Sequence, residues 1–271
     1  MTILQAIILG IIQGITEFLP ISSSGHLILL PQILGWKDQG IAFDAIVHLG
    51  TLLAVVFYFR KKLGSIVNSF LKPGKNSALD RRLGFLLVLS IIPAGIVGLF
   101  GKDYIENNIR SVTVIAIGLI VWGVVLLIAD RLNKHWVGKN KKLSDVNNLS
   151  IKQIIGISCA QAIALIPGTS RSGITMTAGL LGKLDKKAAA EFSFLMSVPI
   201  IALAGGLKVL ELCSNGLGEL SVGVLVVGFI ASAVSGFFAI SGLLKIIQKW
   251  SFLPFVVYRI ILGISLLIWV V

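Results

Sequence analysis

Two short polar segments interrupt a strongly apolar chain and hold most of the side chains that could do chemistry. The first, residues 13–26, reads QGITEFLPISSSGH, and the second, residues 167–175, reads PGTSRSGIT. Each polar group would carry a desolvation cost in the apolar surroundings that the flanking residues suggest. Such a density of polar groups therefore indicates a functional site.

Glu17 is the only carboxylate of the first segment. Gln13 lies four residues before it, so both side chains project from one face of a helix, with Cβ atoms about 5–6 Å apart. An ionised, unpaired carboxylate inside a bilayer is costly, so Glu17 needs an arginine, a metal ion or a proton. A protonated glutamate that caps a neighbouring helix is the structural alternative.

Three serines and a histidine follow Pro20 in the first segment. The hydroxyls of Ser22, Ser23 and Ser24 could act as nucleophiles or bind phosphate, and His26 titrates near neutrality. A turn that satisfies the backbone around Pro20, followed by a buried core histidine, is the alternative. The adjacency of the hydroxyls and the imidazole favours the functional interpretation.

Arg171 is the cation of the second segment. The neighbouring hydroxyls belong to Thr169, Ser170, Ser172 and Thr175. A guanidinium among hydroxyls and glycine amides suits phosphate, because its planar fork donates paired charge-assisted hydrogen bonds. A structural ion pair with Glu17 is the alternative, and such a pair could open for an anionic ligand.

Asp44 and His48 are also four residues apart, early in an apolar segment. We expect a hydrogen-bonded pair there, with metal binding as the second interpretation, and a structural role for Arg259 in the last apolar segment. The whole set offers a carboxylate for a divalent cation, hydroxyls and a histidine for attack, and an arginine for phosphate charge. These groups suit phosphoryl transfer, and in a membrane the natural substrate is a lipid phosphate.

The composition is that of an integral membrane protein. Of the 271 residues, 56% are hydrophobic and only 13% are charged, whereas soluble domains are about a quarter charged. The formal charge of +12 does not indicate nucleic-acid binding, because the basic residues lie mainly between hydrophobic segments, as orientation signals do. No soluble module is predicted that could carry a nucleic-acid groove.

The apolar segments predict a single all-α membrane domain, residues 1–271. Six segments are long enough to span a bilayer: 41–59, 83–101, 112–130, 188–210, 221–246 and 252–271. Residues 2–35 and 151–182 are apolar but broken by the two polar segments, so we predict re-entrant helical hairpins. Irregular backbone at that depth is tolerated only where protein or a polar cavity satisfies it.

The distribution of basic residues predicts the orientation. Lysine and arginine concentrate in the loops 60–82 and 131–152, at 183–187 and at 245–249, so we assign this side to the cytoplasm. The first hairpin then enters from outside and the second from the cytoplasm. The segments FLPISSSG and LIPGTSRSG align, which predicts an inverted repeat of residues 1–130 and 151–271, each with one hairpin and three spans.

The two polar segments closely resemble the signature regions of the undecaprenyl-diphosphate phosphatases, the bacitracin-resistance protein family. The resemblance extends over essentially the whole chain, including FDAIVHLGTL, AAEFSFLMSVP and FLPFVVYR. It implies a multi-pass bacterial inner-membrane enzyme that converts undecaprenyl diphosphate to the monophosphate carrier for peptidoglycan synthesis. The family's pocket is thought to open to the periplasm.

The family resemblance also implies site residues and a cofactor. The [E/Q]-x-x-x-E motif falls on Gln13 and Glu17, the serine loop on Ser22–Ser24, the histidine on His26, and Arg171 on the centre of the second motif. The expected cofactor is a divalent cation, Mg²⁺ with Ca²⁺ as the alternative, held by Glu17 with Gln13 or Asp44. Because Gln13 replaces a glutamate, the metal would have one carboxylate fewer. The nucleophile (Ser23, His26 or water) and the oligomeric state, with a homodimer as one option, stay open.

Two other functions share part of this pattern. The acid-phosphatase-like lipid phosphatases also contain an SGH segment, but they need a second histidine after the Ser-Arg pair, and none follows Ser170-Arg171 here. A transporter or flippase of the carrier lipid would share the inverted repeat, the broken helices and a phosphate-binding arginine. Release of inorganic phosphate in detergent separates hydrolysis from transport.

Overall fold

The computed structural model describes residues 1–72, 74, 77–109, 111–138, 143–146, 148–215 and 221–270. These residues form helices, apart from turns and one isolated β-bridge. The helices are α1 (Ile3–Phe18), α2 (Ser23–Ile33), α3 (Gly40–Tyr58), α4 (Arg60–Leu71), α5 (Ala78–Leu89), α6 (Ile92–Asn108), α7 (Val112–Gly138), α8 (Ile151–Ile163), α9 (Arg171–Leu181), α10 (Lys186–Asn215), α11 (Val222–Lys249) and α12 (Leu253–Val270). Of the predicted basic loops, Lys75, Lys139, Lys141 and Lys142 lie outside the described residues.

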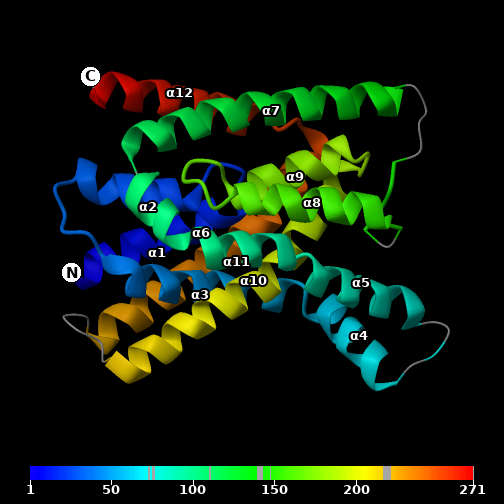
Figure 1. Ribbon diagram of the computed structural model, residues 1–271, viewed down its shortest axis with the longest axis horizontal. Helices are drawn as coiled ribbons and strands as arrows, with labels where there is room; N and C mark the ends of the chain where they lie inside the picture. The colour runs from blue at the N-terminus through cyan, green and yellow to red at the C-terminus, as the bar shows by residue number, and fades with distance from the viewer. Residues whose placement is uncertain are drawn as a thin grey trace.

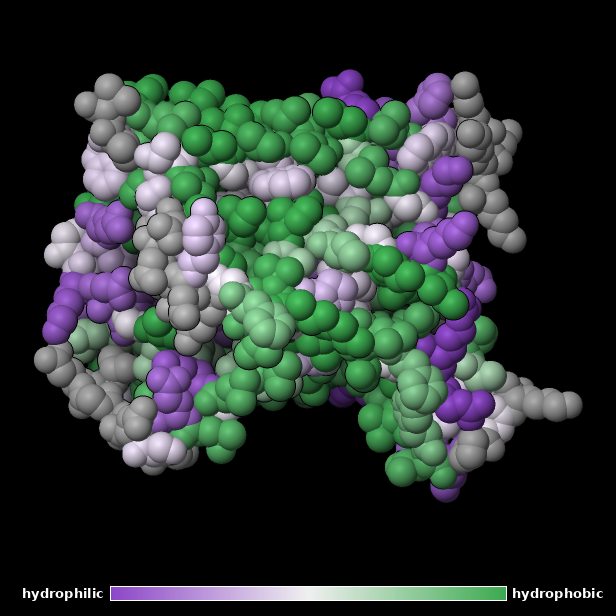
Figure 2. All heavy atoms as spheres, viewed as in Figure 1, coloured by the Kyte–Doolittle hydropathy of each residue, from purple (hydrophilic) through white to green (hydrophobic). Residues whose placement is uncertain are grey.

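The prediction of an all-helical integral membrane protein is confirmed. Within the described residues, five segments are long and apolar enough to cross a bilayer: Gly40–Tyr58, Ala78–Gly101, Val112–Val137, Lys186–Leu212 and Val222–Lys249. On the face seen in Figure 2, apolar side chains cover the middle of the molecule and hydrophilic side chains gather at its two ends. Five of the six predicted spans therefore have a counterpart. The sixth corresponds to the shorter apolar helix Leu253–Trp269.

The span predicted at 83–101 is divided into two helices. α5 ends at Leu89 and α6 begins at Ile92, with Pro93 in its first turn. Proline lacks an amide hydrogen and disfavours helical geometry in the residue before it, which explains the break. The carbonyl of Ser90 at this break accepts a hydrogen bond from Gln161 Nε2 on α8, at 3.1 Å.

Two helical hairpins meet in the middle of the molecule. α1 and α2 turn back at residues 19–22, and α8 and α9 turn back at residues 164–170. Figure 1 shows the second hairpin running in from the right end, and the first lying at the end that holds the N-terminus. At 1.5 Å per residue none of the four helices exceeds about 24 Å, which is shorter than the hydrocarbon core of a bilayer.

The two hairpins share the same local structure at corresponding positions. α1 and α8 each begin with a capping box, Thr2 with Gln5 and Ser150 with Gln153. The caps of α2 and α9 are serines with positive φ, 74° at Ser22 and 72° at Ser170. Each of these serine hydroxyls accepts a hydrogen bond from the amide of a glycine three residues later. The aligned motifs thus fold in the same way.

Small residues hold the first hairpin against the rest of the protein. α1 packs along α11 so closely that a Cβ atom at Gly14 would lie 2.0 Å from Ser235 Oγ and 2.5 Å from the Ser232 carbonyl. Gly236 packs against Phe18 and Ala54, and Gly205 packs against Leu49. These two glycines therefore serve contacts within the chain.

Candidate active site

An ion pair joins the two hairpins. Glu17, near the end of α1, and Arg171, the first residue of α9, approach to 2.9 Å between Oε1 and the guanidinium Nη2. Their side chains are 5% and 14% exposed, so water screens the pair little. Arg171 also donates to the Ser193 carbonyl of α10, at 3.0 Å. Of the partners considered for Glu17, the structure therefore provides the arginine.

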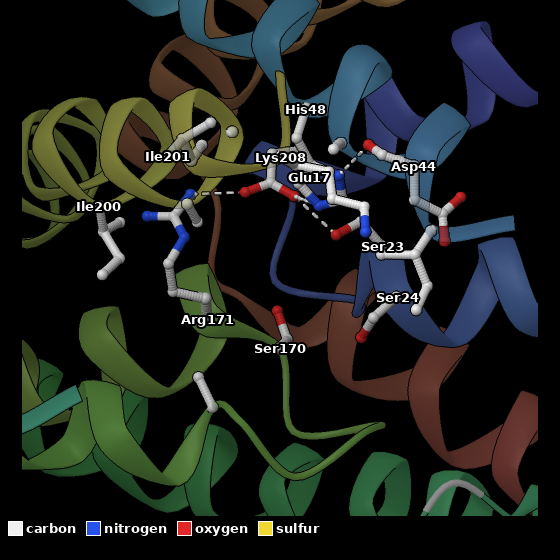
Figure 3. A pocket seen from close by; sticks show the side chains of 15 residues that line it. Glu17, Ser23, Ser24, Asp44, His48, Ser170, Arg171, Ile200, Ile201 and Lys208 are labelled. Carbon is white, nitrogen blue, oxygen red and sulfur yellow. Dashed lines mark hydrogen bonds and ion pairs between the residues drawn. The ribbon is translucent and has the colours of Figure 1, made fainter. Parts of the chain in front are cut away.

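Three further groups lie beside the second carboxylate oxygen of Glu17, Oε2. Ser23 Oγ donates a hydrogen bond to Oε2 at 2.6 Å, and Gln13 Nε2 donates to the same atom at 3.0 Å. His48 Nε2 lies 3.5 Å from it. Figure 3 shows Arg171 and Ser23 reaching Glu17 from opposite sides. The carboxylate is held in one orientation, with a serine hydroxyl in direct contact.

This cluster lies in a cavity of about 410 Å³, within the size range of ligand pockets. The polar side chains that line it are Glu17, Ser23, Ser24, Asp44, His48, Ser170, Arg171 and Lys208. The apolar side chains that line it include Ile41, Ala45, Ile200, Ile201 and Ala204. Charged side chains beside apolar side chains in one cavity suit a ligand that carries phosphate on a hydrocarbon chain.

The predicted phosphate-binding hydroxyls divide into two groups. Ser24 and Ser170 line the cavity, whereas Ser22, Thr169, Ser172 and Thr175 are buried and are not among its lining residues. Ser172 Oγ donates to the Leu19 carbonyl at 2.9 Å, which ties the two hairpin turns together. Thr175 Oγ1 donates to the Arg171 carbonyl at 2.8 Å and lies 2.7 Å from Ser193 Oγ. Ser172 and Thr175 thus support the turn that presents Arg171.

His26 lies outside the cavity lining. Its Nδ1 is 2.7 Å from the Ser22 carbonyl, and its Nε2 is 2.6 Å from the hydroxyl of Tyr258 on α12. The two rings stack with centroids 5.7 Å apart. The imidazole that contacts Glu17 belongs to His48, for which we expected a pair with Asp44, with metal binding as the second interpretation. His48 Nδ1 does lie 2.6 Å from the backbone carbonyl of Asp44. The i, i+4 spacing singled out His48, but no sequence signal connected it with Glu17.

The donor set includes oxygen ligands that suit magnesium. Asp44 lines the cavity and accepts a hydrogen bond from Gln39 Nε2 at 2.8 Å. Gln13 Oε1 is buried without a hydrogen-bond partner. Among the described residues, no group of three or more His, Cys, Asp or Glu could hold a metal ion. Mg²⁺ commonly takes only one or two carboxylates and completes its shell with water and substrate phosphate. The carboxylates of Glu17 and Asp44 are ligands of the kind that this ion takes.

Arg259 on α12 is completely buried and connects both hairpin turns. It donates hydrogen bonds to the carbonyls of Pro20 (3.1 Å) in the first turn and of Gly168 (3.1 Å) and Thr169 (2.9 Å) in the second. Further bonds go to the carbonyls of Gly118 and Leu119 on α7. The sequence predicted a structural role for Arg259 but not that its partners would be the turns beside the site.

A glycine makes this close assembly possible. Gly168 has φ +85°, a conformation that L side chains rarely adopt, and a Cβ atom there would lie 2.3 Å from the Ile115 carbonyl.

Lys208 is a cavity residue that the sequence did not indicate, since it is a single lysine late in an apolar segment. Its place in the cavity, paired with Glu211 at 2.7 Å, comes only from the packing of α10.

Comparisons with known proteins identify the family of this chain. The family model described as "Bacitracin resistance protein BacA" matches residues 6–265. The chain is 47% identical to "Undecaprenyl-diphosphatase 1" of Pseudoalteromonas translucida and 48% identical to "Undecaprenyl-diphosphatase 2" of Stutzerimonas stutzeri, each over 99% of this chain and 98% of the relative. "Undecaprenyl-diphosphatase" of Hahella chejuensis is 46% identical over the same shares. The chain therefore belongs to the BacA family of bacitracin resistance proteins.

Proposed function

We propose that this protein hydrolyses undecaprenyl diphosphate to undecaprenyl phosphate and inorganic phosphate. This recycles the carrier lipid for peptidoglycan synthesis and contributes to bacitracin resistance. The single observation that carries the proposal is the Glu17–Arg171 pair, which unites the two signature motifs in one partly apolar cavity. Relatives that match over nearly the whole chain are named undecaprenyl-diphosphatases. These names do not favour transport of the lipid as the alternative.

Arg171 binds the terminal phosphate of the substrate. Its ion pair with Glu17 opens when phosphate oxygens replace the carboxylate as acceptors, and the Ser193 carbonyl keeps the guanidinium in place. Ser24 and Ser170 add hydroxyl donors at the same cavity. The isoprenoid chain leaves along the apolar side, past Ile200 and Ile201.

Ser23 acts as the nucleophile in this proposal. Its hydroxyl already donates to Glu17 at 2.6 Å, so the carboxylate is placed to take the proton as Ser23 Oγ bonds to the terminal phosphorus. The bond from that phosphorus to the bridging oxygen breaks, and undecaprenyl phosphate leaves with the electron pair. Water then cleaves the phosphoserine, which releases inorganic phosphate and restores the hydroxyl. His26 supports the turn from outside the cavity.

Magnesium is the proposed cofactor, with calcium as the alternative. Glu17 and Asp44 would hold it, and the unpartnered Gln13 Oε1 beside Glu17 is a further oxygen donor. When bound, such an ion neutralises diphosphate charge and polarises phosphoryl oxygens. The protein's own contribution is to orient Ser23 and Arg171 around the phosphate.

For the membrane arrangement we infer six crossings and two re-entrant hairpins in an inverted repeat of residues 1–130 and 151–271. The matched capping boxes and the matched positive-φ serines support this repeat. The helices of both hairpins are too short to cross a bilayer, and the hairpins enter the molecule from opposite ends in Figure 1. α12 would be the sixth crossing, at about 27 Å.

The cavity opens to the outer face of the bacterial inner membrane in this arrangement. Its α3 residues, Ile41 to His48, lie near the start of that helix, and its α10 residues, Ile200 to Lys208, lie in the second half. Both stretches are on the side opposite the basic loops, which face the cytoplasm by the positive-inside rule. A homodimer remains a further part of the proposal, and Gly206 has open space beside it for such a contact.

Phosphate release by purified protein in detergent tests the function. Wild type given undecaprenyl diphosphate and Mg²⁺ should release phosphate, and a chelator should stop it. Arg171→Ala should lower turnover at least about 100-fold, as expected when a charge-stabilising donor is lost. Detergent removes sidedness, so a transporter would release nothing. Absence of release by well-folded wild type, or near-normal release by Arg171→Ala, would refute the proposal.

A further inference from the structure

A second cavity lies far from the candidate active site. It measures about 340 Å³ and forms where α7 and α11 end and α10 begins. Lys186 lines this cavity and Lys208 lines the active-site cavity, on the same helix. At 1.5 Å per residue, about 33 Å of helix separates them. The second cavity therefore belongs to the opposite end of the molecule, where the basic loops gather.

Three lysines from three different elements surround this cavity: Lys134 on α7, Lys186 on α10 and Lys249 on α11. Lys186 is already engaged, since its Nζ lies 2.9 Å from Asp130 Oδ1 and 3.3 Å from the Trp250 carbonyl. Over the part of the chain that the structure describes, Lys134 and Lys249 form neither an ion pair nor a hydrogen bond. Two ammonium groups are thus available to a ligand.

One acidic side chain shares the lining. Asp185 Oδ1 accepts a hydrogen bond from the Ala188 amide at 2.8 Å, so this carboxylate caps the start of α10. It is part of the helix terminus and does not neutralise both free lysines. The cavity therefore favours an anion.

The remaining lining identifies the kind of anion. Val137, Leu143 and Ile247 give the cavity an apolar side, and Val137 is 54% exposed on the surface of a membrane-spanning helix. Trp250 is 67% exposed at the end of α11, the depth at which indole rings meet lipid headgroups. A free phosphate ion would use only the lysines. A phospholipid would use the lysines and the apolar side together.

We propose that this cavity binds the phosphate headgroup of an anionic phospholipid from the leaflet on the basic side of the protein. Lys134 and Lys249 contact the phosphate, and the acyl chains lie against the apolar residues beside them. Basic pockets between membrane helices commonly bind anionic headgroups in this way. The proposal does not depend on the phosphatase activity, because the two cavities lie far apart.

Native mass spectrometry of the full-length protein in detergent tests the site. The probes are dioleoyl phosphatidylglycerol and dioleoyl phosphatidylcholine, which differ in headgroup charge but not in acyl chains. Wild type should bind the anionic lipid at least about tenfold more tightly, and Lys134→Gln/Lys249→Gln should remove that preference. The matched control Lys61→Gln/Lys152→Gln loses the same charge at exposed positions outside the cavity and should keep it.

Three results would overturn the proposal: equal binding of both lipids by wild type, equal losses in the two double variants, or displacement of the lipid by an equal concentration of inorganic phosphate. The last result would identify a site for free phosphate. Phosphate release in detergent, or thermal unfolding if that activity is absent, checks that both variants are folded.

Discussion

Replacing Arg259 tests whether the hairpin turns must be held together for catalysis. Within the described residues, the carbonyls of Pro20, Gly168 and Thr169 receive hydrogen bonds only from Arg259. Arg259→Met removes all three hydrogen bonds and keeps a long apolar stem. Because Arg259 pairs with carbonyls and not with a carboxylate, the substitution leaves no unpaired buried charge.

The size of the effect follows from these three carbonyls. A buried acceptor that loses its partner costs about 1–3 kcal/mol, so the gross loss is about 3–9 kcal/mol. Relaxation of the turns would recover part of this, and the turns carry Ser22 and Ser170, next to Ser23 and Arg171. A displacement of about 1 Å at a reacting group costs on the order of 100-fold in rate. We therefore expect kcat to fall about 100-fold and the apparent Tm to drop by several degrees.

The assay is phosphate release in detergent, with thermal unfolding followed on the same samples. Arg259→Lys keeps the charge but has three donors instead of five, so its kcat should fall between those of wild type and Arg259→Met. Tyr258→Phe is the neighbouring control, since it removes only the contact with His26, and it should stay within about tenfold of wild type. If Arg259→Met keeps both kcat and Tm near wild-type values, the turns do not depend on this residue.

Four further substitutions test the site. Gln13→Glu places a second carboxylate beside Glu17 Oε2, where Gln13 Nε2 now lies at 3.0 Å, so the Mg²⁺ concentration for half-maximal activity should fall; an unchanged Mg²⁺ titration would argue against metal binding there. With substrate labelled in its terminal phosphate, Ser23→Ala should abolish both phosphate release and the labelled phosphoenzyme, whereas His26→Ala should leave the phosphoenzyme detectable. The reverse pattern would make His26 the nucleophile. Lys208→Gln should raise KM for the diphosphate about tenfold with little change in kcat, because it removes a cation of the cavity that does not contact Glu17 or Ser23. A large loss of kcat at unchanged KM would contradict a role of Lys208 in substrate binding.

Local sequence patterns predicted much of the fold and part of the site. Long apolar runs predicted five spans that the structure contains. The prolines and glycines that interrupt the two remaining apolar segments predicted the two hairpin turns. The pairing of Gln13 with Glu17 followed from their i, i+4 spacing. The break at Ser90–Ile91 could have been expected from Pro93, but the segment around it is continuously apolar and was interpreted as one helix.

The roles of individual hydroxyls and histidines were not readable from the same patterns. Ser22 and Ser23 are neighbours, yet one caps its own helix and the other contacts Glu17, because the start of α2 turns their side chains in different directions. His26 and His48 both stand near acids or hydroxyls in the sequence, but only His48 faces Glu17. Which side of a helix meets the cavity depends on partners far away in the chain.

The sequence by itself determined the membrane class, the hairpins and the two polar motifs, because hydrophobic length and backbone punctuation are local properties. Tertiary structure alone decided that Glu17 meets Arg171, that Arg259 joins both turns, and that lysines from α7, α10 and α11 surround a second cavity. These contacts join residues far apart in the chain, and helix packing sets them through close approach at small residues such as Gly14 and Gly168. Local spacing carries no information on which distant helix supplies the partner.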